Sequence, residues 1–203
     1  MDAKRGRGRP RSFEPDQALG HVLDVFWRKG FAASSLDELA AAAGLNRLNL
    51  ATAFGDKKAL YLAALARFRG ELQAALSSMP GASGSLEERL NAFYEAAIDL
   101  YTSSAGGPLG CLIMCTAAVE AAHDPRVRLF FVEVQQEIDA ALAACFERDL
   151  RDGADAKVLG QLGAAVLQSL ALRARSGADR NDLLSLARAA SGLLARSATR
   201  QST

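Results

Sequence analysis

The sequence contains few of the residues on which catalytic and metal sites depend. Of its 203 residues, two are histidine and three are cysteine. Two histidines give no basis for a Ser/His/Asp or Cys/His arrangement, and there is no glycine-rich phosphate loop. Cys111, Cys115 and His123 are too few ligands, without a spacing motif, for a structural metal site. We therefore predict that the protein is not an enzyme and that it has no catalytic residues, no cofactor and no metal.

Long apolar runs are also missing. No run approaches the roughly 18 apolar residues that a membrane-spanning helix needs, and no apolar segment of a secretion signal follows the positively charged start. The odd number of cysteines does not suit a disulfide framework. These absences predict a cytoplasmic protein with free thiols and no membrane partner.

Alanine and leucine, by contrast, are abundant. Hydrophobic residues make up 50% of the chain and aromatic residues 6%, and glycines cluster between long stretches of helical periodicity. This composition predicts an all-α fold. The length allows either one large domain or a small domain joined to a larger one. We predict a basic arm over 1–12, a compact three-helix domain over 13–58 and a larger helical domain over 59–203.

Positive charge is concentrated at the start of the chain. The formal net charge is only +1, yet "MDAKRGRGRPR" places five cations against one acid. Glycines between the cations favour a flexible basic arm, in which Arg5, Arg7 and Arg9 are candidates to contact DNA phosphates. A solvated tail without a role is the alternative interpretation.

Two very short helices are predicted after a first helix over about 15–29. Ser35 stands three residues before Glu38, as in a capping box, and Gly44 can adopt the left-handed conformation that ends a helix. Asn46 can cap the next helix, which ends near Gly55. Helices of about two turns are unstable alone, so packing must hold them. This spacing is that of a helix-turn-helix domain, whose second helix enters the major groove of DNA.

The outward face of that second helix carries side chains that can read bases. With Leu50 and Phe54 turned inward, Arg47, Asn49 and Thr52 face outward, and these residue types bind guanine, adenine and the thymine methyl group. Cations at the start of the following helix oppose its dipole, so phosphate contacts explain them better. The predicted DNA contacts are Arg47, Asn49, Thr52, Ser34, Ser35, Lys57, Lys58, Arg5, Arg7 and Arg9.

The whole pattern resembles the TetR family of bacterial transcriptional regulators. The resemblance rests on "RGRPRSF", "VFWRKGFAASSLDELAAAAGLNR" and "AFGDKKALYLAAL", and it is strong over about residues 5–69. Family members usually carry proline, a small polar residue, leucine and tyrosine where this chain has Leu48, Asn49, Leu50 and Ala51. The tyrosine that ordinarily reaches a phosphate is therefore absent.

The resemblance implies a homodimeric, ligand-responsive regulator, expected to be a repressor, that binds a palindromic operator in double-stranded DNA. By the resemblance, 59–203 is a ligand-binding and dimerisation domain whose last two helices form a four-helix bundle across the two-fold axis. The segment 158–172 is apolar on more than one face, which independently favours an interface over a central core helix. The predicted interface residues are Leu159, Leu162, Val166, Leu170, Leu183, Leu186 and Leu193.

The implied effector is a small molecule that releases the protein from DNA. Few charged residues are candidates for its pocket, so we expect a mainly apolar or aromatic compound. Side chains of these types are more often ordinary core than ligand contacts, and the sequence does not separate the two interpretations. The predicted pocket residues are Phe93, Tyr94, Tyr101, Cys111, Ile113, Met114, Phe131 and Gln135.

Two other functions fit parts of the sequence. Cys111 follows "PLG" near a predicted helix start that could lower its pKa, which suits a regulator that senses electrophiles or oxidants through its thiol. The plainer interpretation is that Cys111 and Cys115 are two small hydrophobic residues buried in the core. A protein-interaction module without DNA binding is the alternative from another class.

Overall fold

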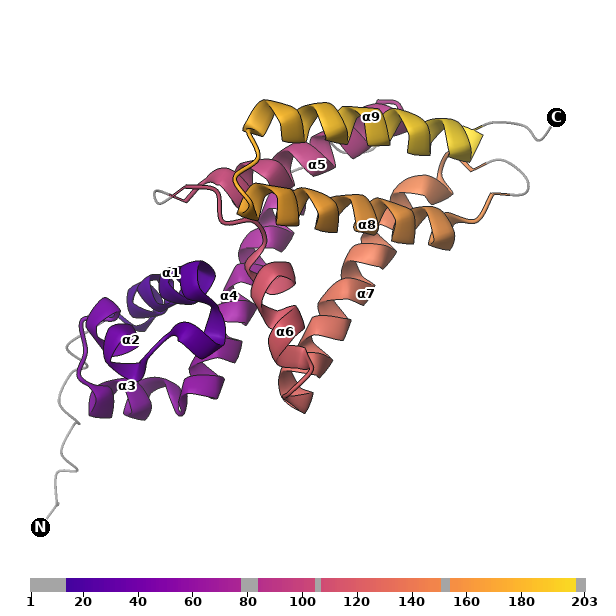
Figure 1. Ribbon diagram of the computed structural model, residues 1–203. Helices are drawn as coiled ribbons and strands as arrows, with labels where there is room; N and C mark the ends of the chain where they lie inside the picture. The colour runs from indigo at the N-terminus through magenta and orange to yellow at the C-terminus, as the bar shows by residue number, and fades with distance from the viewer. Residues whose placement is uncertain (1–13, 78–83, 105–106, 151–153, 200–203) are drawn as a thin grey trace, which may run out of the picture.

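The computed structural model describes residues 14–77, 84–104, 107–150 and 154–199 (Figure 1). Every regular element in these ranges is helical, as the composition predicts. Arg5, Arg7 and Arg9 of the predicted basic arm lie outside the described residues. The helices are α1 (Pro15–Ala33), α2 (Leu36–Ala42), α3 (Arg47–Phe54), α4 (Lys57–Ser77), α5 (Leu86–Thr102), the π-helix η1 (Ile113–Ala117), α6 (Ala118–Ala121), α7 (Pro125–Glu147), α8 (Ala156–Arg175) and α9 (Arg180–Thr199).

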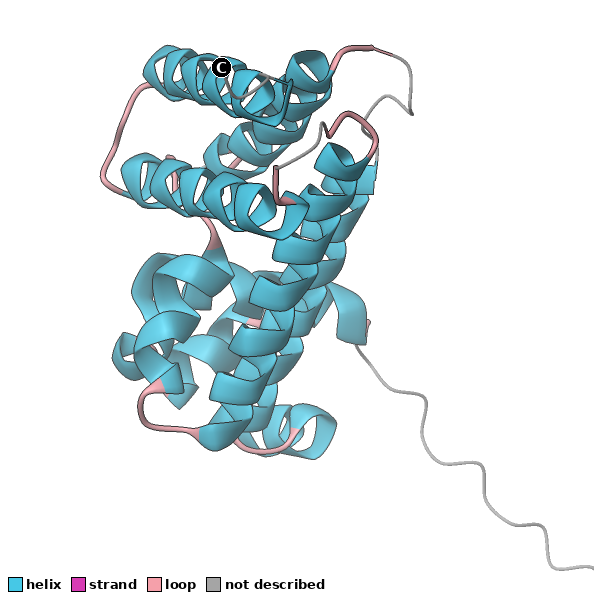
Figure 2. Cartoon of the chain, turned by 90° about the vertical axis from the view of Figure 1, so that its right-hand side faces the viewer, coloured by secondary structure: helices cyan, strands magenta, loops and turns pink. Residues whose placement is uncertain are grey.

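The helices form a small head and a larger body. In Figure 1, α1, α2 and α3 gather at the lower left, and α4 leads from them into the body. There α5, α8 and α9 lie close together at the top, while α6 and α7 descend beneath α8 (Figures 1 and 2). The head therefore projects from the body with α3 on its outer side, away from α8 and α9.

The predicted caps define most helix starts. Ser35, Asn46 and Asp124 accept hydrogen bonds from backbone amides in the first turns of α2, α3 and α7. The capping box of Ser85 and Glu88 is complete at α5. At α2, by contrast, the Glu38 carboxylate forms an ion pair with Lys29 at 2.5 Å. These bonds satisfy amides that would otherwise lack partners at a helix start.

Aromatic side chains hold α1 against α4. The Trp27 ring packs edge-on against Phe68 at 4.9 Å between centroids, and Phe26 packs edge-on against Tyr61 at 5.0 Å. All four side chains are buried. Offset and edge-on ring pairs add to the free energy gained by apolar burial. The stable pair α1 and α4 therefore provides the surface on which the short helices α2 and α3 pack.

Two backbone features were not predicted. Before α7, the segment Ile113–Ala117 is a π-helix that continues directly into α6. The helix α1 also extends three residues past Gly30, which interrupts it with φ 76° and ψ −179°. Glycine tolerates that positive φ without a steric cost. Within the described ranges, we find no helix that is both long and apolar enough to cross a membrane.

Candidate nucleic-acid interface

The recognition helix α3 is anchored by its inner face. Leu50 is 2% exposed and packs into the core of the head, and the Asn46 side chain accepts a hydrogen bond from the backbone amide of Asn49 at 2.8 Å. Gly55 ends the helix with φ 82°. Because α3 has only eight residues, these contacts and not its own helical propensity fix its position.

Its outer face is formed by Arg47, Leu48, Asn49, Ala51 and Thr52, all of which are exposed. The Thr52 hydroxyl donates to the carbonyl oxygen of Leu48 at 2.8 Å. Leu48, which the sequence analysis did not include among the contacts, is 75% exposed. An apolar residue is ordinarily assigned to the core, and the residue spacing of so short a helix does not reveal that Leu48 is exposed.

The Arg47 guanidinium is held by Asp37 of α2. Its Nε and Nη2 donate to the two carboxylate oxygens, and both side chains are largely exposed. These hydrogen bonds lower the pKa of Asp37 and raise the pKa of Arg47. Asp37 thus takes two of the five N–H donors of the guanidinium and holds it against α2.

The two predicted serine contacts differ in position. Ser34 is 2% exposed, and its hydroxyl donates to the carbonyl oxygen of Gly30 at 2.6 Å. The prediction that it contacts DNA is therefore wrong for this structure, since its hydroxyl is buried. Ser35 is exposed beside α2, where its oxygen accepts from the Glu38 amide.

The two predicted lysine contacts also differ. The Lys57 Nζ lies 4.4 Å from the centroid of the Phe31 ring, a cation–π contact near the surface of the head. Lys58 instead forms an ion pair with Asp124, 2.5 Å from Oδ2, and this hydrogen bond lowers the pKa of Asp124 to about 2. Because Asp124 is the N-cap of α7, Lys58 joins α4 to the body, and its predicted role as a phosphate contact is not supported.

Further hydrogen bonds join the head to the body. The Trp27 indole donates to the carbonyl oxygen of Gly110 at 3.0 Å, and the Tyr61 hydroxyl lies 2.7 Å from that of Thr116 in η1. Arg175, in the last turn of α8, donates to the carbonyl oxygens of Trp27, Arg28 and Leu109. The direction of the head is thus tied to α8 and to the segment around η1.

The predicted pocket residues belong mostly to the core. Five of the eight, namely Phe93, Tyr94, Tyr101, Cys111 and Ile113, are at most 1% exposed. The Tyr94 hydroxyl donates to the carbonyl oxygen of Gly163 at 3.0 Å. Met114, Phe131 and Gln135 are partly exposed.

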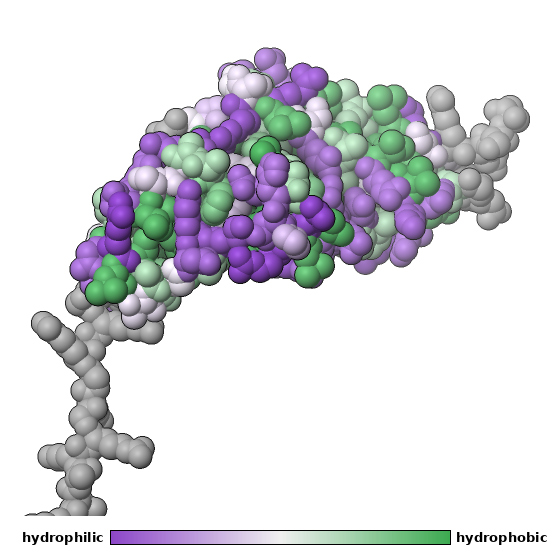
Figure 3. All heavy atoms as spheres, turned by 60° about the horizontal axis from the view of Figure 1, so that its bottom comes forward, coloured by the Kyte–Doolittle hydropathy of each residue, from purple (hydrophilic) through white to green (hydrophobic). Residues whose placement is uncertain are grey.

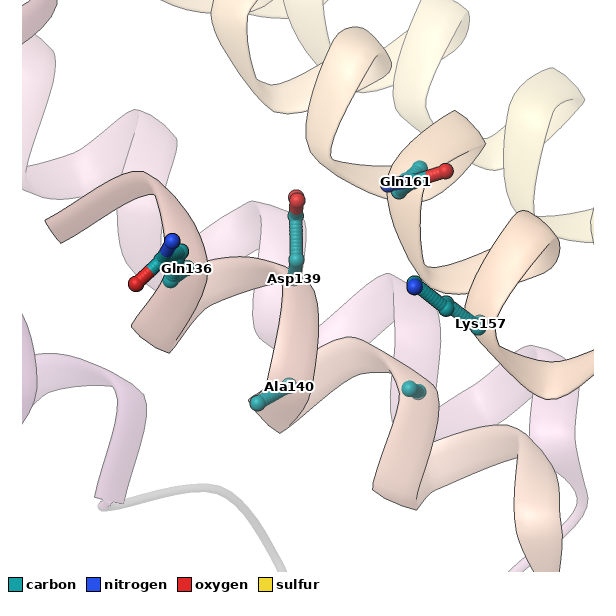
Figure 4. A pocket seen from close by; sticks show the side chains of 6 residues that line it. Gln136, Asp139, Ala140, Lys157 and Gln161 are labelled. Carbon is teal, nitrogen blue, oxygen red and sulfur yellow. The ribbon is translucent and has the colours of Figure 1, made fainter. Parts of the chain in front are cut away.

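An open groove of about 460 Å³ lies elsewhere, between α7 and α8 (Figure 4). Its lining includes both polar side chains and alanines, and burial raises the pKa of its Asp139 carboxyl. None of its residues was among the predicted ones. Its lining consists of Gln136, Asp139, Ala140, Ala143, Lys157 and Gln161.

Cys111 is buried, and burial raises the pKa of its thiol to about 12. The thiolate is the reactive form of cysteine. The prediction of a lowered pKa at this position is therefore wrong, and the structure disfavours Cys111 as a sensor.

The predicted interface residues separate into two groups. Leu159, Leu170 and Leu183 are buried within their own subunit, which makes their assignment to a dimer contact wrong. Leu162 and Leu193 are 52% and 61% exposed, and so are two apolar neighbours on α8, Val158 at 49% and Leu172 at 57%. Val166 and Leu186 are partly exposed.

Comparison with known proteins supports the interpretation of the head. The profile for "Bacterial regulatory proteins, tetR family" matches residues 23–64, which span most of α1, α2, α3 and the start of α4. The HTH-type transcriptional repressor ComR of Escherichia coli (strain K12) is 28% identical over 189 residues, 91% of this chain and 90% of the relative. Residues 23–64 of this chain therefore match the TetR family. Members of this family are DNA-binding transcription factors and not enzymes.

Other relatives extend this TetR-family likeness over most of the chain. The repressor BdcR of Escherichia coli (strain K12) is 28% identical, with 84% of this chain and 83% of the relative covered. A cysteine variant of the TetR family regulator CifR, solved with 26-base-pair double-stranded operator DNA, is 28% identical with a TM-score of 0.81, covering 91% of this chain and 98% of that one.

Proposed function

We propose that this protein is a homodimeric repressor of the TetR family that binds a two-fold symmetric operator in double-stranded DNA through α3. The observation that carries the proposal is the placement of α3, which is anchored by Leu50 while five neighbouring side chains remain exposed on the outer side of the head. The relatives named repressors, and the CifR complex with operator DNA, support it.

In this proposal, Asn49 and Thr52 face base edges, and Ser35 and Lys57 contact phosphates on either side. Phosphate contacts position the protein, whereas base contacts specify the sequence. Arg47 serves to neutralise Asp37, since an unpaired carboxylate beside α3 would repel the DNA backbone. Arg5, Arg7 and Arg9 add cations that contact phosphates without regard to sequence.

The proposed dimer is formed by α8 and α9. Val158, Leu162, Leu172 and Leu193 are large apolar side chains about half or more exposed in the single chain. Their burial against a second copy is favourable, and a C2 dimer would use the same surface on both subunits. Two copies of α3 would then face successive major grooves, roughly 34 Å apart.

The proposed effector is a small, mainly apolar or aromatic molecule that enters the body near Met114 and Phe131. It would displace core side chains such as Tyr101 and shift η1, whose Thr116 contacts Tyr61 of α4. Gly110, shortly before η1, accepts the hydrogen bond of the Trp27 indole. An effector changes DNA affinity only if it binds the two states with different affinity. Met114 and Phe131 are partly exposed and pack against the buried core, which supports this route.

The test is selection of duplexes from a random DNA library by the purified protein, followed by binding at increasing salt. We expect recovery of sequences with two inverted half-sites, and a steep linear decrease of log affinity with log salt concentration. A panel of aromatic compounds is then tested for release of the selected DNA. Failure to enrich any sequence, together with salt-independent binding, would contradict the function and favour the protein-interaction module.

A further inference from the structure

We propose that α3 reads thymine methyl groups in the major groove through Leu48 and Ala51, and not guanine through Arg47. The inference rests on the proposed function, because it names the chemistry that the same helix recognises. It predicts which base the operator must present and which side chain detects it.

Leu48 is the most exposed large apolar side chain in the described part of the protein, at 75%. Scattered exposed leucines are common on protein surfaces, but Leu48 has exposed companions. Ala51 and Thr52 lie three and four residues later, so the three side chains adjoin one another on one face of α3. Figure 3 shows hydrophobic residues reaching the surface at the left-hand end of the molecule, where the head lies.

Two polar side chains beside this apolar surface already have partners within the head. The Asp37 carboxylate accepts hydrogen bonds from Nε and Nη2 of Arg47. The Thr52 hydroxyl is donated to the Leu48 carbonyl oxygen, which leaves its methyl group for other contacts. A guanine contact by Arg47 would have to use the N–H groups that Asp37 does not take, whereas apolar contact by Leu48 requires no donor and no rearrangement.

The chemistry of the major groove then selects the partner. The thymine C5-methyl is the apolar group that distinguishes a base pair there, and small apolar side chains contact it. Asn49, next to Leu48, has an exposed amide of the kind that binds adenine through N6 and N7. A half-site containing adjacent T·A and A·T pairs under α3 would therefore match this surface.

The test replaces thymine by deoxyuridine, one position at a time, in a duplex selected from the random library. Removing one methyl group from an apolar contact should weaken binding by about fourfold at the positions under α3. The same duplexes are measured with Leu48→Ala, for which the effect of the replacement should disappear at one position, because the two contacting groups are coupled. Leu129→Ala, which removes a leucine 62% exposed on α7, is the matched control and should keep full sensitivity to the methyl group.

The possible outcomes distinguish the methyl-reading role of Leu48 from the proposed DNA-binding function. If sequences are enriched but deoxyuridine has no effect under α3, or acts equally on Leu48→Ala and the parent protein, the methyl-reading role is wrong while DNA binding stands. If no sequence is enriched, the proposed function itself fails. Sensitivity to deoxyuridine that Leu48→Ala abolishes supports the inference.

A second variant tests the role assigned to Arg47. Asp37→Ala releases the guanidinium, and we expect its selected sequences to gain a guanine that the parent sequences do not require. Asp182→Ala, at an exposed acid in the first turn of α9, should leave the selected sequences unchanged. A guanine requirement in the parent protein that Arg47→Ala removes would overturn the proposal.

Discussion

At the residue scale, neighbouring side chains of the same type have different partners. Lys57 lies over the Phe31 ring, whereas Lys58 is paired with the carboxylate that caps α7. The sequence "DKK" shows two equivalent cations at a helix start. Only the fold distinguishes the one that remains near the surface of the head from the one that joins the head to the body.

Lys57→Ala should therefore weaken DNA binding and reduce the slope of log affinity against log salt by about 1. Lys58→Ala should leave that slope unchanged and lower the melting temperature, because it removes the nearer of the two cations that pair with the Asp124 carboxylate, the other being Arg126 at 3.7 Å. Equal loss of slope in both variants would contradict the distinction.

The effect of Lys58→Ala on stability should also depend on pH. The pKa of Asp124 is about 2 in the folded protein against an ordinary 3.8, so the ion pair stabilises the protein fully above 3.8. Its contribution decreases as the pH falls through about 2, where the carboxylate is protonated. The difference in melting temperature between Lys58→Ala and the parent should therefore be largest near neutral pH and shrink in acid.

Residue roles were the least predictable feature of the site. Asn46, Gly44 and Gly55 act through local backbone rules, so the sequence predicted where α3 begins and ends. The pairing of Arg47 with Asp37 and the burial of Ser34 depend on how α2 lies on its neighbours. Such contacts between helices leave no periodic signal in the sequence.

At the element scale, α7 and α8 cross without space for a side chain between them. A Cβ atom on Gly160 would lie 2.8 Å from both the Ala143 amide nitrogen and the Asp139 carbonyl oxygen. These are backbone atoms, so the helices themselves would have to separate. A glycine within an apolar helical segment is visible in the sequence, but the helix that packs against it is not.

Gly160→Ala should lower the free energy of unfolding by about 1 to 3 kcal/mol, the usual cost of overpacking. Gly70→Ala in α4, where a Cβ atom would meet nothing within 4 Å, is the matched control. It should stabilise the protein by up to about 1 kcal/mol through helix propensity. Denaturant unfolding measures both, and a neutral Gly160→Ala would contradict the described crossing.

A second element-scale prediction concerns Arg175, which ties α8 to the end of α1. Arg175→Met removes the donors to the carbonyl oxygens of Trp27 and Arg28, so amide hydrogen exchange at the end of α1 should accelerate. Arg173→Met removes an exposed arginine two residues earlier that bonds to Ser169, and exchange in α1 should not change. If amide exchange at the end of α1 is as slow in Arg175→Met as in Arg173→Met, the bonds from Arg175 do not hold the head.

At the scale of the whole molecule, the proposed dimer joins two heads at a fixed separation. The sequence predicted an all-α fold and apolar last helices. It could not separate leucines that pack inside one subunit, such as Leu170, from those that remain outside, such as Leu162, because both follow the same helical period. The effector pocket was predicted poorly for the same reason, since core and pocket linings share one composition.

Leu162→Asp combined with Leu193→Asp should convert the dimer to monomers and reduce operator affinity at least tenfold, since each head would then bind alone. Leu129→Asp, on exposed α7 surface, should leave the mass unchanged. Sedimentation equilibrium measures the oligomeric state. A double variant that stays dimeric would show that the interface lies on another surface.

Hydroxyl-radical footprinting of a selected duplex tests the central proposal most directly, because it reports which backbone positions the protein covers. We predict two symmetric sets of protected positions about one helical turn apart, roughly 34 Å between centres, and loss of both sets with the Leu162→Asp and Leu193→Asp double variant. Protection of a single set by the parent dimer, or uniform cleavage at low salt, would contradict the account.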